Sequence, residues 1–200
     1  MKKVLITGGT SGIGLATLSK LVLNYEVIFT YCSNETKALK LEEKYNIKGY
    51  RLDLNDKNSI EELVSKLNNI DILINNAGIA LDNDFNLKTY EEFSEVVNTN
   101  LTGTYYLTKL LVKKINSGGE IIFVSSTNGV DTPYIESIDY DASKAGVISL
   151  MQNMANMLAP NLRVNAVAPG WVNTKMNETL SEEFKKVEEE KILLGRFADP

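Results

Sequence analysis

The chain of 200 residues has no histidine. This absence excludes Ser-His-Asp and Cys-His nucleophile arrangements and the usual zinc ligand sets. Tyrosine, lysine and the carboxylates remain as the groups that can transfer protons. We therefore expect no metal centre.

Cysteine and long apolar runs are also scarce, and the chain has no net positive charge. Cys32 is the single cysteine, which excludes an intramolecular disulfide and is typical of a reducing compartment. The formal net charge is -5, whereas a nucleic-acid-binding protein needs a basic face. The run Met1–Gly8 has too few apolar residues for a signal peptide or a membrane span. We expect a cytoplasmic protein that binds neither nucleic acids nor membranes.

Short apolar runs alternate with helical periodicities along the chain. In the first 53 residues they give strand, helix, strand, helix and strand, the parallel half-sheet that binds a mononucleotide. The pattern predicts one α/β domain over 1–200, a doubly wound parallel sheet of Rossmann-like strand order 3-2-1-4-5-6. The charged segment 171–195 is predicted to be a mobile lid. Predicted strands are 4–7, 26–30, 49–53, 70–74, 120–124 and 163–168; predicted helices are 15–25, 34–45, 59–67, 90–114 with a perturbation near 98–103, 140–158 and 181–191.

A glycine-rich turn joins the first strand to the first helix. Gly8, Gly12 and Gly14 are spaced one residue more widely than in the common dinucleotide fingerprint. Such a turn lets the backbone approach a pyrophosphate and directs helix N–H groups at it. Asp53, at the end of the third strand, could bond an adenine. Together these features predict a dinucleotide cofactor.

Tyr140 and Lys144 lie one helical turn apart if a helix begins at Tyr140. An ammonium at about 4 Å, with an effective dielectric of about 20, is worth roughly 4 kcal/mol. That would lower the pKa of the phenol from ~10 toward ~7. Tyr105 and Lys109 have the same spacing, but they lie well inside a long helical segment, where packing is the ordinary role. Position therefore favours Tyr140.

Short motifs follow one another in order along nearly the whole chain. They are Thr7-Gly8-x-x-x-Gly12-Ile13-Gly14, Asp53-Leu54, Asn75-Asn76-Ala77-Gly78, Asn100-Leu101-Thr102-Gly103, Ser126-x-x-Gly129, Tyr140-x-x-x-Lys144, Asn165-x-x-x-Pro169-Gly170 and Thr174. In this order they resemble the short-chain dehydrogenase/reductase family of the single-domain kind. The resemblance implies an NAD(P)-dependent enzyme that reversibly reduces a carbonyl to an alcohol.

The resemblance also implies catalytic roles. Tyr140 would pass a proton to the substrate carbonyl, and Ser126 would hold that oxygen by a hydrogen bond. Lys144 would bond the nicotinamide ribose, and Asn100 would sustain a water-linked proton path through a distortion of its helix. Ser126 is preferred to Ser125 because the family's catalytic serine precedes a glycine by three residues.

The cofactor contacts follow from the same resemblance. NADP(H) is favoured because the second strand ends without an acid that could hold both ribose hydroxyls. NAD(H) stays open, because Ser11 is neutral and Glu35 is suitably placed to serve NAD. The implied contacts are Gly8, Thr10, Ser11, Gly12, Ile13, Gly14, Cys32, Ser33, Asp53, Leu54, Asn76, Ala77, Gly78, Tyr140, Lys144, Pro169, Gly170, Val172 and Thr174.

The partners are expected to be small carbonyl or alcohol substrates. The motifs are most similar in style to bacterial 3-oxoacyl-acyl-carrier-protein reductases, which points to an acyl-carrier-protein or CoA thioester. A sugar, polyol or small-ketone dehydrogenase is the alternative enzyme. A nucleotide-sensing protein without catalysis is the alternative outside enzymes. The resemblance also implies a homodimer or homotetramer.

The chain departs from the family pattern in two places. The spacing from Ser126 to Tyr140 is one residue longer than usual, so we expect a remodelled loop. The segment 195–200 resembles a point where relatives continue into a helix and a last strand, so we expect that strand to be absent.

Three carboxylates near Tyr140 are expected to be solvated loop residues. Trp171 is expected to be either a packing residue of the lid or a wall of the pocket. These carboxylates are Glu136, Asp139 and Asp141.

Overall fold

The computed structural model, which describes residues 1–178 and 180–200, contains a single six-stranded sheet in the order β3-β2-β1-β4-β5-β6. All neighbouring strands are parallel, as the alternation of strands and helices predicts. The predicted Rossmann-like strand order is therefore confirmed. The strands are β1 (Lys3–Ile6), β2 (Glu26–Tyr31), β3 (Lys48–Arg51), β4 (Ile70–Asn75), β5 (Ile115–Val124) and β6 (Arg163–Val167).

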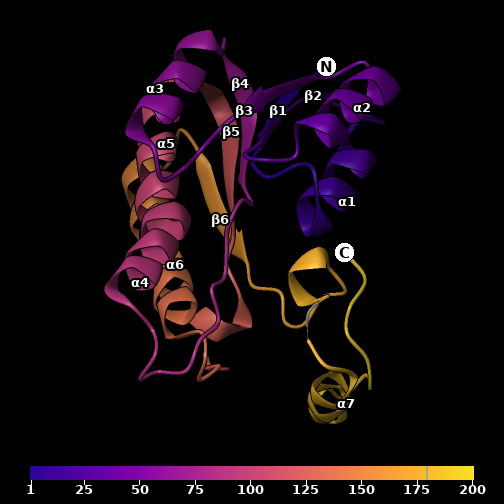
Figure 1. The fold of residues 1–200 in the computed structure, drawn as a ribbon. Coiled ribbons are helices and arrows are strands. Elements are labelled where there is room, and N and C mark those ends of the chain that lie inside the picture. Colours follow the sequence, from indigo (N-terminus) through magenta and orange to yellow (C-terminus); the bar gives the residue numbers. More distant parts are fainter. Residues whose placement is uncertain (179) are drawn as a thin grey trace.

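Helices cover both faces of the sheet (Figure 1). On one face, α1 and α2 pack over Phe29 and its apolar neighbours; on the other, α3, α5 and α6 pack over Phe123. Because both faces are covered, the strands are nearly continuous apolar runs. The α-helices are α1 (Gly12–Leu21), α2 (Glu35–Tyr45), α3 (Lys57–Lys66), α4 (Tyr90–Val97), α5 (Thr104–Leu111), α6 (Ile138–Leu158) and α7 (Glu182–Lys191). Among the described helices, none is both long and apolar enough to cross a membrane.

The predicted perturbation near 98–103 is a π-helix. It spans Asn98–Gly103 and joins α4 to α5. At its end, a Cβ on Gly103 would lie 2.0 Å from the Leu54 carbonyl oxygen. Only a glycine lets this turn approach the loop after β3 so closely. The wider π turn also gives Asn100 a position of its own, as described below.

Parallel strands bring their carboxyl ends to one edge of the sheet, where the connecting loops form a crevice. The segment after β6 leaves this edge, carries α7, and returns (Figure 1). It returns through a bridge between Val172 and Ala198, and the rings of Trp171 and Phe197 stack with centroids 5.4 Å apart. The described part of 171–195, the segment that we call the lid, thus stands beside the crevice.

Candidate active site

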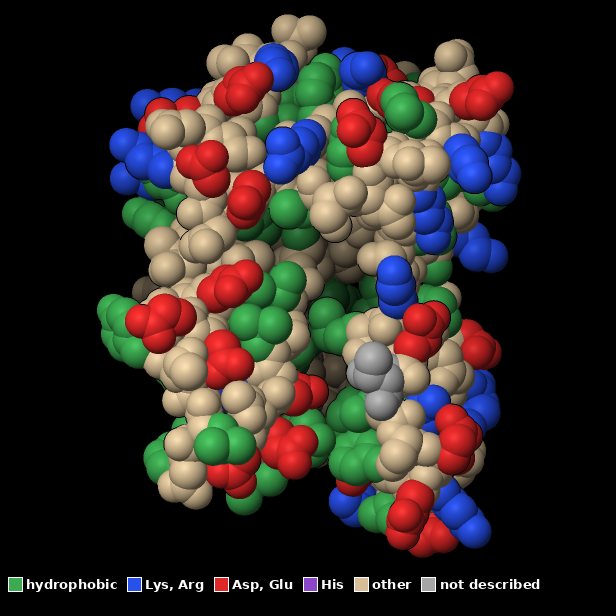
Figure 2. Space-filling model, in the orientation of Figure 1, with side chains coloured by type: hydrophobic (Ala, Val, Ile, Leu, Met, Phe, Trp, Pro, Cys, Tyr) green, Lys and Arg blue, Asp and Glu red, His purple; other side chains and the backbone are tan. Residues whose placement is uncertain are grey.

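A cavity of about 900 Å³ opens at the carboxyl edge of the sheet. The space-filling view shows a hollow on this face, between the helical side of the molecule and the lid, with apolar side chains gathered along it (Figure 2). Ligand sites commonly have volumes of about 300–1,000 Å³. The cavity is lined from the glycine turn at one end to Tyr140 and Lys144 at the other.

The glycine turn is shaped to receive an anionic group. Ser11 is the N-cap of α1, makes no side-chain cap bond among the described residues, and no acidic residue lies in the first turn. The free N–H groups of this helix start are therefore available to a phosphate. A Cβ on Gly14 would lie 2.2 Å from the Gly8 carbonyl oxygen, and Gly12 has a φ of +48°. The turn thus requires glycine at these positions, and its donors fit the pyrophosphate of a dinucleotide.

Asn76 ties the end of β4 to this turn. Its Nδ2 donates to the carbonyl oxygens of Thr7, at 2.9 Å, and Gly8, at 3.3 Å. The backbone N–H groups of Asn76 and Ala77 both donate to Thr7 Oγ1, at 3.0 and 2.9 Å. These four bonds hold β4 and the glycine turn in one arrangement at the nucleotide end of the cavity.

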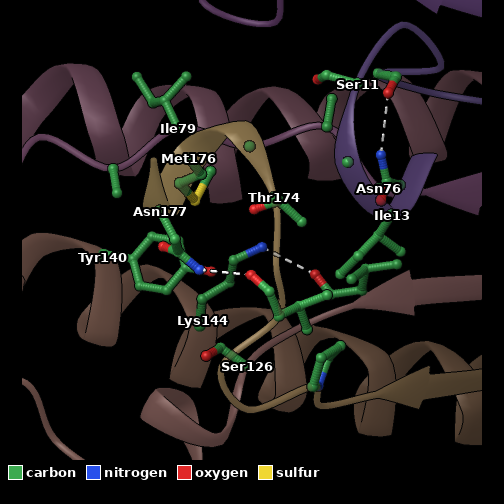
Figure 3. A pocket seen from close by; sticks show the side chains of 18 of the residues that line it. Ser11, Ile13, Asn76, Ile79, Ser126, Tyr140, Lys144, Thr174, Met176 and Asn177 are labelled. Atoms are coloured by element: carbon green, nitrogen blue, oxygen red, sulfur yellow. Dashed lines mark hydrogen bonds between the residues drawn. The ribbon is translucent and has the colours of Figure 1, made fainter. Parts of the chain in front are cut away.

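Ser126, Tyr140 and Lys144 lie together at the other end (Figure 3). Tyr140 and Lys144 lie on α6, and Ser126 follows β5. The Lys144 side chain is buried, its Nζ lies 5.4 Å from the centre of the Tyr140 ring, and it donates to the Val124 carbonyl oxygen at 2.9 Å. Burial lowers the pKa of Lys144 to about 8. An ionisable amine is thus held under a phenol beside a serine hydroxyl.

Asn100 lies behind the cavity and does not line it. It is 2% exposed, and its Oδ1 accepts from the Ile79 N–H at 2.8 Å. Its Nδ2 donates to the Ile79 carbonyl at 2.9 Å and to Ser143 Oγ at 3.1 Å. The π turn therefore uses the amide of Asn100 to hold the loop after β4 against α6.

Comparisons with known proteins agree with this geometry. The short chain dehydrogenase family model matches residues 2–185. The chain belongs to the short-chain dehydrogenase family. A 3-oxoacyl-acyl-carrier-protein reductase of Aquifex aeolicus is 39% identical over 100% of this chain and 85% of its own length. An acetoacetyl-CoA reductase of Rhizobium meliloti is 34% identical over 98% of this chain and 85% of its own. The crystal structure of BdcA in complex with NADPH is 25% identical, with a TM-score of 0.92, and the match covers 100% of this chain and 82% of that one.

In this short-chain dehydrogenase, every residue predicted to be catalytic or to contact the cofactor lines the cavity, except Asn100 and Glu35, the residue considered for NAD. Their individual roles remain predictions. The Ser125 hydroxyl donates to the Lys144 carbonyl oxygen at 2.9 Å, so it attaches α6 to the end of β5. Tyr105, the tyrosine of the second spaced pair, is 40% exposed on α5 and lies outside the cavity lining.

The expected pKa of Tyr140 is wrong in direction. Burial raises the pKa of the phenol, a hydrogen bond with Ser126 opposes this rise, and the charges of Asp141 and Asp82 add to it. Lys144 does not reverse the effect, because its own pKa of about 8 leaves the amine neutral at the higher pH where the phenol titrates. Desolvation of the phenolate therefore outweighs the attraction that the sequence predicts.

Two of the carboxylates expected to be solvated are not. Asp139 is fully buried and its Oδ2 lies 2.9 Å from Lys88 Nζ. Asp141 accepts hydrogen bonds from the Asn128 side chain and from the Tyr134 backbone N–H, both at 2.8 Å. Glu136 is exposed, as expected. Asp141 therefore fastens the loop between Ser126 and Tyr140, whereas Asp139 pairs with a residue before α4. The expected remodelling of this loop stays a prediction.

Some lining residues were missed or left undecided. Trp171 fills both roles considered for it, because it lines the cavity and packs against Phe184 and Phe197 of the returning segment. No motif in the sequence singles out the lining residues in the loop before α6 and in the lid. These residues include Asn128, Pro133, Tyr134, Met176, Asn177 and Glu188.

Proposed function

We propose that this short-chain dehydrogenase reversibly reduces a carbonyl to an alcohol with NADP(H). The observation that carries the proposal is one cavity with two distinct ends. One end has the uncapped start of α1, and the other has Ser126, Tyr140 and Lys144. When bound, NADPH supplies the hydride for the carbonyl carbon.

The side chains at the second end would transfer the proton and stabilise the negative charge that develops on the carbonyl oxygen. Because burial raises the pKa of Tyr140, the phenol is protonated at neutral pH, which is the form a general acid needs. Ser126 would hold the carbonyl oxygen by a hydrogen bond. Lys144 lies beneath the phenol, where its amine can bond the ribose of the cofactor.

Arg51 supports NADP(H) rather than NAD(H). Its Nε donates to the Cys32 carbonyl oxygen at 3.3 Å, so its guanidinium lies at the tip of β2. Among the described residues it forms no ion pair with a carboxylate, and the lining segment 31–34 contains no acid. An unpaired guanidinium favours a 2′-phosphate, which it can bind through two parallel hydrogen bonds. The neighbour BdcA is described with NADPH, which agrees with this choice.

A 3-oxoacyl thioester is the proposed substrate class. The relatives named above include reductases of 3-oxoacyl-acyl-carrier-protein and of acetoacetyl-CoA. The competing enzyme is a sugar, polyol or small-ketone dehydrogenase. An assay of acetoacetyl-CoA with NADPH, beside a panel of free alcohols with NADP, separates the two. Turnover of a free alcohol without any thioester turnover would remove the proposed substrate class.

Tyr140→Phe tests whether the protein is catalytic. We expect turnover of acetoacetyl-CoA to fall by about 10²–10⁴-fold, the usual contribution of a general acid. NADPH affinity, measured by fluorescence titration, should be nearly unchanged because only one hydroxyl is removed. Tyr105→Phe is the matched control and should leave turnover unchanged. Equal turnover of the Tyr140 variant and the wild type would refute the catalytic role of Tyr140, and NADPH binding without turnover in either protein would favour a nucleotide-sensing protein.

A further inference from the structure

The lid touches the glycine turn through Thr174. A Cβ added to Gly12 would lie 3.1 Å from Thr174 Cγ2, so Thr174 packs directly against the turn. Figure 3 shows Thr174 between Ile13 of the turn and Met176 of the lid. The next residue, Lys175, also lines the cavity. Because consecutive Cα atoms are about 3.8 Å apart, the Lys175 side chain starts beside the turn.

The backbone that carries Lys175 is fixed by hydrogen bonds on both sides. Asn177 Nδ2 donates to the Val172 carbonyl oxygen at 2.8 Å. The Asn173 backbone N–H donates to the Ala198 carbonyl oxygen, also at 2.8 Å. The Lys175 side chain, by contrast, is exposed and has a flexible four-carbon stem. A fixed backbone and a long side chain allow the ammonium to reach a phosphate that lies on the glycine turn.

Three lysines line the cavity, and they differ in their partners. Lys144 donates to a backbone carbonyl at the Tyr140 end. Lys191 Nζ lies 2.5 Å from a carboxylate oxygen of Glu188. Lys175 forms no ion pair with any residue that the structure describes. Its positive charge is therefore available to a ligand in the cavity.

An anionic cofactor favours such a cation. The start of α1 offers neutral N–H groups to a pyrophosphate, and an ammonium adds a charge-assisted hydrogen bond, which is about twice as strong as a neutral one. Neither the turn 8–14 nor the segment 172–177 contains an acid that would repel the anion. The carboxylates that line the cavity belong to other segments; they are Asp53, Asp82, Glu95 and Glu188.

We propose that Lys175 binds the pyrophosphate of the nicotinamide cofactor and thereby holds the lid against the glycine turn. The pyrophosphate is common to NAD(H) and NADP(H), so Lys175 strengthens the binding of both. Arg51 differs, because its proposed partner is the 2′-phosphate that only NADP(H) carries. The proposal rests on the proposed function to the extent that it requires a dinucleotide in this cavity.

Lys175→Gln tests the contact by removing the charge from an exposed side chain. We expect the Kd values for NADPH and NADH, measured by fluorescence titration, to rise by the same factor of about five or more, as for a lost hydrogen bond to a charged group. The ratio of the two Kd values should be unchanged. Added salt should weaken binding less in this variant than in the wild type, because screening acts on the contact that the variant lacks. Lys175→Arg keeps the charge and should bind both cofactors nearly as tightly as the wild type.

Lys186→Gln is the matched control. Lys186 is an exposed lysine of the same lid, and it lies outside the cavity lining. Its loss changes the net charge by the same amount and should leave both Kd values unchanged. An equal loss of affinity in the two variants would show a general effect of charge and would overturn the proposal.

A phosphate of the thioester substrate is the competing ligand for Lys175. In that case Lys175→Gln would leave the Kd for NADPH unchanged and raise KM for acetoacetyl-CoA. KM for acetoacetyl-N-acetylcysteamine, which has no phosphate, would stay the same. This result, or unchanged values of both Kd and KM, would overturn the assignment to the cofactor.

The proposed function can fail separately from this contact. A wild-type protein that binds NADPH but reduces no carbonyl would refute the proposed reaction. An equal loss of NADPH and NADH affinity in Lys175→Gln would still support the contact in that protein. A wild-type protein that binds neither cofactor would refute both.

Discussion

Lys144 shows how one residue can lower stability where it serves the site. The residue is only 4% exposed, yet it carries an amine. Burial lowers its pKa from the ordinary 10.5 to about 8, because the charged form is poorly solvated. At neutral pH the amine is protonated in both states, but the folded protein binds this proton less tightly than the unfolded chain does. This difference lowers the free energy of unfolding.

The stability of the apoprotein should reveal this cost. Between pH 8 and 10.5 the unfolded chain keeps the Lys144 proton and the folded protein releases it. The free energy of unfolding therefore rises with pH through that window, and this gain is lost as the pH falls through about 8. Lys144→Met should stabilise the apoprotein at pH 7 by up to about 3 kcal/mol and abolish turnover. Urea unfolding of both proteins at pH 7 and 10 checks this. A destabilised variant whose difference from wild type did not change with pH would contradict it.

Arg51 is the residue that decides cofactor choice in our proposal. Arg51→Gln should weaken binding of 2′,5′-ADP about ten-fold or more, because a charge-assisted contact to a phosphate is lost. Binding of 5′-AMP, which lacks the 2′-phosphate, should be unchanged. Calorimetric titration of both nucleotides measures the ratio directly. Lys48→Gln, an exposed change on the same strand, is the control. An unchanged ratio in the Arg51 variant would assign the preference to other groups.

At the scale of elements, a buried ion pair joins the loop before α4 to the first turn of α6. The side chains of Lys88 and Asp139 are 5% and 0% exposed, and the lysine also donates to the Leu81 carbonyl. The same loop is bonded to Ser137 through Asp82. These contacts support the start of the helix that carries Tyr140.

Removing one partner of that pair should be costly. Lys88→Met leaves Asp139 buried without its cation, and we expect a loss of about 3–5 kcal/mol in the free energy of unfolding. The exposed pair Lys57–Glu61, with Nζ and Oε1 3.5 Å apart, offers the control. Lys57→Met should change stability by less than about 1 kcal/mol. Equal shifts of the urea midpoints for the two variants would contradict the assigned importance of the buried pair.

At the scale of the whole molecule, the lid is held by fewer buried contacts than the sheet. Helix α7 has no buried residue among those the structure describes; its Phe184 packs against Trp171 and Tyr134, and its Glu188 accepts a hydrogen bond from Trp171 Nε1. The sheet, by contrast, has apolar cores on both faces. We propose that 171–195 opens as a unit separate from the sheet.

Trp171, the single tryptophan, reports on this opening. Its fluorescence should change at a lower urea concentration than far-UV circular dichroism, because the lid opens before the sheet unfolds. Saturating NADPH should bring the two transitions together if it bridges lid and sheet. Coincident transitions without the cofactor would show that the lid and sheet unfold as one unit.

The expected homodimer or homotetramer also stays a prediction, which sedimentation would test.

The sequence by itself determined the order of the elements, the glycine turn, the π perturbation near Asn100 and the spacing of Tyr140 and Lys144. These follow from periodicity, turn chemistry and helical spacing, which act over a few residues. The helix boundary was less well determined, since α6 begins at Ile138 rather than at Tyr140.

Only the tertiary structure decided the raised pKa of Tyr140, the pairing of Asp139 with Lys88, and the hold of Asp141 on Asn128. Lys88 and Asp139 are 51 positions apart in the chain, so no local pattern connects them. Burial and hydrogen bonding depend on which atoms the fold brings around a group. The same carboxylate is a solvated charge in one surrounding and a fixed acceptor in another.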